Sequence, residues 1–138
     1  MTVLTIGTFD LFHTGHVNLL AACRRLAGPT GQVVVGINTD GFAEGFKRKP
    51  VMTSSERRAV VAACRYVDRA ALNFDRGYGL IRSVKPQILV IGSDWAKKDY
   101  FKQIGMCEAE LLDQGTQLVY VPYTSSISTT KLRERMKK

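Results

Sequence analysis

The two histidines of the chain, His13 and His16, stand three residues apart just after a short apolar run. Around the start of a helix, side chains at this spacing share one side. Unpaired backbone N–H groups attract an anion at the same place. Imidazole N–H groups there could stabilise charge that develops on phosphates during a displacement. The simpler alternative is that both histidines are ordinary polar residues at a helix start. Zinc binding would need a third protein ligand, and none is evident. The pair favours phosphate chemistry.

Glycine flanks this pair on both sides of the turn. Gly7 ends the apolar run, and Gly15 lies between the histidines, where we expect it to leave room for phosphate oxygens close to the backbone. A G-x-G-x-x-G pattern is absent from the sequence. The turn therefore does not indicate a dinucleotide-binding oxidoreductase.

Alternating strands and helices must position these residues. Apolar, β-branched runs predict five strands, at 2–6, 32–38, 67–72, 88–91 and 118–121. Helices are predicted at 16–26, 53–63, 79–84, 100–114 and 128–138. The second begins with a capping box at 53–56, and the fourth is interrupted at 105. Residues 39–50 are expected to form a mobile loop. This order predicts one α/β domain over residues 1–138, a Rossmann-like doubly wound five-stranded parallel sheet with ligands beyond the carboxyl ends of its strands.

Composition restricts the class of protein. The formal net charge of +8 suits a polyanionic ligand, either a nucleotide or a nucleic acid. No basic helix is interleaved with aromatic residues, which argues against nucleic acid. The three cysteines lie far apart without a C-x-x-C pair, so neither a disulfide framework nor a zinc site is indicated. No run approaches the roughly 20 apolar residues of a membrane span, and no secretory leader is evident, so we expect a cytoplasmic protein.

The stretch G-T-F-D-L-F-H-T-G-H at 7–16 resembles the G-T-F-D-x-x-H-x-G-H signature of the cytidylyltransferase-like nucleotidyltransferases. The resemblance is strongest to the short branch typified by glycerol-3-phosphate cytidylyltransferase. Three further segments agree in order and spacing: R-Y-V-D at 65–68, G-S-D-W at 92–95 for the family's G-D-D-W, and I-S-T-T-K at 127–131. The resemblance runs from about residue 5 to residue 131.

The resemblance implies an enzyme that transfers CMP from CTP to a phosphorylated alcohol such as glycerol 3-phosphate and releases pyrophosphate. It also implies Mg²⁺ carried mainly by the phosphates, and a homodimer. One departure is Tyr123, where the branch has an arginine that could clamp a phosphate bidentately. Two alternatives therefore stay open: an adenylyltransferase that uses ATP and a sugar phosphate or another phosphate, and a nucleic-acid-binding or nucleotide-sensing protein on the same fold.

The resemblance also assigns roles to residues of this chain. The expected catalytic residues are His13, His16, Lys47, Ser128 and Thr129. The expected nucleotide-binding residues are Gly7, Thr8, Phe9, Asp10, His13, Gly15, His16, Arg65, Gly92, Asp94, Ile127, Ser128 and Thr129. The expected substrate-binding residues are Asp40, Lys47, Lys49, Arg58 and Trp95, and no side chain is identified as a metal ligand.

Several of these residues have a structural alternative. Asp10 either fixes the turn or helps to place a metal or phosphate. Ser128 suits a helix N-cap in any case. Lys47 and Lys49 could be a solvated surface run, Arg58 a helix-surface residue, and Arg65 part of a dimer interface.

Overall fold

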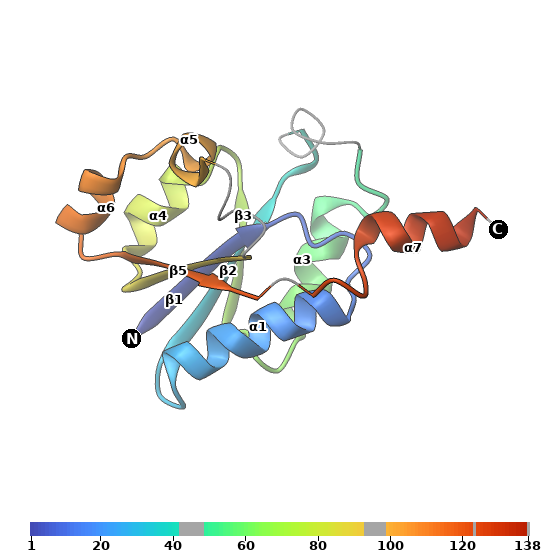
Figure 1. Ribbon diagram of the computed structural model, residues 1–138, viewed down its shortest axis with the longest axis horizontal. Coiled ribbons are helices and arrows are strands. Elements are labelled where there is room, and N and C mark those ends of the chain that lie inside the picture. Colours follow the sequence, from blue (N-terminus) through green and yellow to red (C-terminus); the bar gives the residue numbers. More distant parts are fainter. Residues whose placement is uncertain (42–48, 93–98, 123, 138) are drawn as a thin grey trace.

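The sheet of this protein holds five parallel strands. The computed structural model describes residues 1–41, 49–92, 99–122 and 124–137. The strands are β1 (Thr2–Gly7), β2 (Gln32–Asn38), β3 (Arg69–Asn73), β4 (Ile88–Gly92) and β5 (Gln117–Val121). Their order is β3-β2-β1-β4-β5, so the chain moves outward in one direction from β1 and then in the other (Figure 1). This topology confirms the predicted Rossmann-like fold and places a switch point between β1 and β4, where such sheets bind ligands.

Helices cover both faces of the sheet. They are α1 (Thr14–Ala27), α3 (Ser54–Ala62), α4 (Tyr78–Val84), α5 (Tyr100–Ile104), α6 (Glu108–Asp113) and α7 (Thr129–Met136). Because successive strand residues point to opposite faces, Val3 packs in the core beneath α1 and α3, and Leu4 in the core beneath α4, α5 and α6. α7 extends beyond the carboxyl edge of the sheet and contains no buried residue (Figure 1).

The element boundaries differ from the predicted ones in places that have a local cause. The third strand begins at Arg69 rather than 67 because the Val67 amide closes a turn onto Cys64. The expected helix at 100–114 is two helices, since Gly105 caps α5 with a φ of +73°. The capping box before α3 is confirmed, with Thr53 Oγ1 3.2 Å from the Glu56 amide nitrogen.

Part of the expected loop at 39–50 lies outside the described residues. In the described part, Asp40 and Gly41 are helical rather than irregular. None of the described helices is both long and apolar enough to cross a membrane.

The return from α1 to β2 depends on a glycine. A Cβ on Gly31 would lie against the Ala27 carbonyl oxygen and 2.6 Å from the Met1 carbonyl oxygen, and neither backbone atom can move aside freely. We expect Gly31→Ala to lower the free energy of unfolding by about 1–3 kcal/mol in urea titrations. Gly41→Ala is the control, because no described atom lies within 4 Å of its Cβ. Equal stability of the two variants would contradict this account.

Candidate functional site

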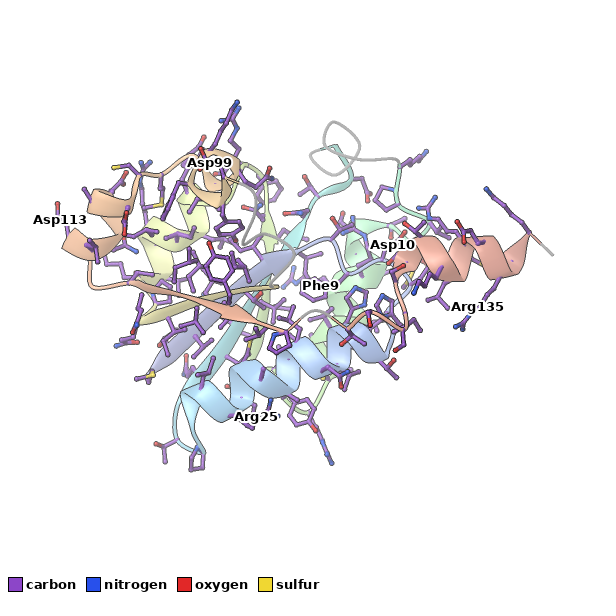
Figure 2. The ribbon with its side chains drawn as sticks, in the orientation of Figure 1. Phe9, Asp10, Arg25, Asp99, Asp113 and Arg135 are labelled. Carbon is purple, nitrogen blue, oxygen red and sulfur yellow. The ribbon has the colours of Figure 1, made fainter. Side chains whose placement is uncertain are left out.

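A cavity of about 320 Å³ opens at the carboxyl edge of the sheet, beside the switch point. The turn between β1 and α1 forms one wall, the ends of β4 and β5 another, and the segment that leads into α7 a third. Figure 2 shows Phe9 and Asp10 of the turn between the sheet and the start of α7. The expected site residues on the wall are Gly7, Thr8, Phe9, His13, Gly15, His16, Gly92, Ile127, Ser128 and Thr129.

The two imidazoles stack against each other on this wall. Their ring centroids are 3.8 Å apart and their planes differ by 27°. His13 is the N-cap of α1, and its Nδ1 accepts from the Gly15 amide at 3.0 Å. The His13 amide in turn donates to Nδ1 of His16 at 3.2 Å. Since both Nδ1 atoms accept, the ring N–H of each histidine is at Nε2.

The surroundings fix the orientation of both rings and the charge of His13. Partial burial lowers the pKa of His13 below its ordinary value of 6.5, so this imidazole is neutral at pH 7. His16 packs between Phe12, at 5.4 Å between ring centroids, and Phe9, at 5.2 Å. The His13 ring is therefore a neutral N–H donor, and the His16 ring is held in place by its aromatic neighbours.

Gly15 has a packing role in addition to the expected one. A Cβ at this position would lie 2.8 Å from Cε1 and 3.0 Å from Nδ1 of His13. The missing side chain thus makes room for the His13 ring. Gly15 also lines the cavity, so its expected contact with phosphate oxygens stays a prediction.

Asp10 fixes the turn, which was one of its two expected roles. Its carboxylate accepts from the amides of Val51 at 2.8 Å and Met52 at 2.9 Å, and from Arg133 at 3.2 Å. Its carbonyl oxygen accepts from the Thr129 hydroxyl at 2.9 Å. Asp10 is buried and is not among the residues that line the cavity.

Arg57 is the functional residue that sequence reasoning missed. Its side chain is fully buried, and it donates to the carbonyl oxygens of Thr8 at 2.8 Å, Asn38 at 2.7 Å and Met52 at 3.0 Å. It also donates to the Asp40 carboxylate at 2.7 Å. This guanidinium joins the β1–α1 turn, the end of β2 and the entrance of α3. The helical spacing could have indicated its burial, because Arg57 stands four residues before the buried Val61 and so lies on the same face of α3.

The expected substrate-binding residues with a described position do not reach the cavity wall. Asp40 accepts from Arg57 and from Ser54, and the hydrogen bond from Arg57 holds the pKa of Asp40 below its ordinary value. Arg58 is exposed on α3. The side chain of Lys49 is exposed, and its carbonyl oxygen accepts from Arg133 at 2.8 Å.

Arg65 is not among the residues that line the cavity. Arg65 lies ahead of β3, near the amino edge of the sheet, where the neighbouring Asp68 accepts from the Val33 amide and from Arg24. Its guanidinium donates to the Tyr66 hydroxyl at 3.0 Å. The cavity lies at the opposite edge. Lys47, Asp94, Trp95 and Tyr123 lie outside the described residues.

The start of α7 brings a second helix N-terminus to the cavity. Ser128 is its N-cap, and its Oγ accepts from the Lys131 amide at 3.1 Å. Ser128 and Thr129 line the cavity opposite the start of α1. Two helix N-termini and two imidazole N–H donors thus surround one space, an arrangement that suits a polyanion. Across the described ranges, no group of three His, Cys, Asp or Glu side chains could hold a metal.

Comparison with known proteins relates this geometry to one family. The sequence profile of the cytidylyltransferase-like family matches residues 4–135. An FAD synthase of Methanopyrus kandleri is 38% identical over 93 residues, which are 67% of this chain and 62% of that protein. A glycerol-3-phosphate cytidylyltransferase of Bacillus subtilis is 34% identical over 137 residues, 97% of this chain and 95% of that one. A lipopolysaccharide core biosynthesis protein of Thermoplasma volcanium superposes with a TM-score of 0.71 and 26% identity, over 90% of this chain and 96% of that chain.

Removal of the buried guanidinium should weaken the whole edge of the sheet. Arg57→Met leaves the carbonyl oxygens of Thr8 and Asn38 without this donor, and each buried orphan costs about 1–3 kcal/mol. We expect the free energy of unfolding to fall by about 2–4 kcal/mol in urea. Arg58→Met is the matched control, which should shift stability by no more than about 0.5 kcal/mol because Arg58 is exposed. Similar losses in both variants would refute the assignment.

The lowered pKa of His13 gives a pH test of its capping role. The unfolded chain takes up a proton near pH 6.5, and the folded chain does so only at lower pH. Stability from this group is therefore present above pH 6.5 and is lost as the pH falls below it. His13→Asn keeps a good N-cap that does not titrate. Between pH 7.5 and 5.5, urea titrations should show a smaller loss of stability in the variant than in the wild type; an equal loss would exclude the role.

Proposed function

The chain belongs to the cytidylyltransferase-like family, and on that premise we propose that it transfers a nucleoside monophosphate from a nucleoside triphosphate to a phosphorylated alcohol and releases pyrophosphate. The observation that supports this most is the pair of stacked imidazoles on the cavity wall, each with its N–H at Nε2. The cavity volume of about 320 Å³ is within the range of small-molecule sites.

The reaction is a direct in-line displacement. A phosphate oxygen of the acceptor attacks the α-phosphorus of the nucleotide, a new P–O bond forms, and the bond to the pyrophosphate oxygen breaks with its electron pair. The nucleophile is already an anion, so no strong base is needed. His13 and His16 donate hydrogen bonds to the oxygens on which charge increases, and catalysis consists of positioning and charge stabilisation.

The start of α7 takes the far end of the triphosphate. Ser128, Thr129 and the adjacent backbone N–H groups hold β- and γ-phosphate oxygens, while the start of α1 holds the α-phosphate. Gly7, Thr8, Phe9, Gly92 and Ile127 complete the nucleotide site. Lys47, Lys49, Asp94 and Trp95 remain in the proposal as contacts that the family implies, and all but Lys49 lie outside the described residues.

The nucleotide is CTP and the acceptor resembles glycerol 3-phosphate. The similarity to the Bacillus subtilis glycerol-3-phosphate cytidylyltransferase supports this choice, because it extends over 95% of that protein. ATP is the second candidate, supported by the 38% identity to an FAD synthase, whose product contains an adenylyl group. That match covers 67% of this chain, and an FAD synthase of Korarchaeum cryptofilum is 29% identical over 97% of it.

A divalent ion and a second subunit also belong to the proposal. The described side chains do not form a cage for Mg²⁺, and the Asp10 carboxylate already accepts from two amides and Arg133. As the family implies, the ion is carried mainly by the phosphates. The homodimer is carried over from the family, with Arg65 and Asp68 near its interface.

Turnover assays test both the mechanism and the substrate. The wild type is incubated with CTP or ATP and with glycerol 3-phosphate, a sugar phosphate or flavin mononucleotide, and pyrophosphate release is measured. His13→Asn and His16→Ala should each lower kcat about 10²–10³-fold with the preferred pair, as loss of an oxyanion donor does. Near-wild-type turnover in both variants would reject the mechanism. Salt-sensitive binding of RNA or DNA without nucleotide turnover would favour the nucleic-acid alternative instead.

A further inference from the structure

Polar side chains at the carboxyl ends of β1, β2 and β3 form one row of hydrogen bonds. Thr8 follows β1, Asn38 ends β2 and Asn73 ends β3. Asn38 and Asn73 are partners in the strand register, and their exposed fractions are only 7% and 1%. We call these three residues the Thr8–Asn38–Asn73 row. It ends at the cavity, because Thr8 is on the wall.

The direction of every hydrogen bond in this row is fixed from its outer end. The Asp75 carbonyl oxygen can only accept, so Asn73 must present its NH₂ group there, at 2.6 Å. The same NH₂ group donates to Oδ1 of Asn38 at 2.9 Å. Asn38 must therefore turn its own NH₂ group toward Oγ1 of Thr8, at 3.3 Å.

The Thr8 hydroxyl is consequently an acceptor within the row, and its proton is left to donate elsewhere. Within the described part of the chain, no residue accepts from it, and Thr8 lines the cavity. We propose that Asn38 and Asn73 are positioning residues that orient the Thr8 hydroxyl as a hydrogen-bond donor to a phosphate oxygen of the bound nucleotide. This inference rests on the proposed function and deepens it.

Two observations support a role in orientation rather than in strand pairing alone. Oδ1 of Asn73 is buried without a hydrogen-bond partner among the described residues, a cost that an aliphatic side chain would avoid. Moreover, Nη1 of Arg57 donates to the carbonyl oxygens of both Thr8 and Asn38, so their backbones are already tied together. Arg57 therefore connects the two backbones already, and the side-chain hydrogen bonds of the Thr8–Asn38–Asn73 row in addition set the orientation of the Thr8 hydroxyl.

A change that keeps the shape of the side chain but replaces its amide by a carboxylate can reverse the direction at one point. Asn38→Asp has almost the same shape, and its carboxylate still accepts from Asn73. It cannot donate to Thr8, so the Thr8 hydroxyl turns to donate to the new carboxylate and is lost to the ligand. The Kd of the nucleotide should rise about tenfold, because this is the change expected from the loss of one hydrogen bond. The measurement is titration calorimetry with CTP and with ATP in the presence of Mg²⁺.

A double-mutant cycle separates this effect from simple charge repulsion. Thr8→Val removes the hydroxyl and should also raise the Kd about tenfold. If Asn38 acts through Thr8, Asn38→Asp has no further effect in the Thr8→Val background. Repulsion between the new carboxylate and the phosphates would persist there. Gln87→Glu is the matched control, since it makes the same change at the amino edge of the sheet, where Gln87 accepts from the Thr2 amide at 2.6 Å.

A second variant covers the case that Asn38→Asp does not fold, as judged by thermal unfolding. Asn73→Ala removes the donor that orients Asn38 and should raise the Kd only when Thr8 is present. Equal losses of affinity with and without the Thr8 hydroxyl, or an unchanged Kd in both asparagine variants, would overturn the inference alone. A wild type that binds neither CTP nor ATP would overturn the proposed function as well.

Discussion

A buried positive charge at the edge of the sheet determines how the cavity is built. The Arg57 guanidinium cannot be left unpaired in the interior, so it gathers acceptors from several segments: the carbonyl oxygens of Thr8, Asn38 and Met52, and the Asp40 carboxylate. Three of these partners belong to the ends of β1 and β2 and to the entrance of α3. The turn that bears the histidines is thereby attached to the rigid part of the fold.

The turn itself needs this support because its backbone is unusual. Phe9 and Leu11 have φ values of 55° and 50°, in a region that residues other than glycine rarely occupy. Asp10, between them, accepts from two amides ahead of α3 and from Arg133 of α7. These contacts hold the turn in a conformation that places the His13 ring over Gly15 and against His16.

The sheet and the histidine pair could be predicted from sequence because both depend on local patterns. Apolar runs separated by helical spacing specify parallel strands, and the spacing of His13 and His16 alone places their rings on one side. Arg57 could not be placed in this way, since most of its acceptors are backbone carbonyl oxygens, which leave no side-chain signature in the sequence. The position of Arg65 could not be predicted either, because its motif does not say at which edge of the sheet it lies.

The lack of buried residues in α7 affects how readily this part of the site can open. This helix contains no buried residue, and its described links to the turn are polar: the Thr129 hydroxyl to Asp10, and Arg133 to Asp10 and to the Lys49 carbonyl. Water competes for such links, whereas it does not for the apolar contacts beneath α1. Segments held in this way detach at a smaller free-energy cost than the rest of a domain. We therefore expect the wall formed by the start of α7 to open at a smaller free-energy cost than the wall formed by the sheet.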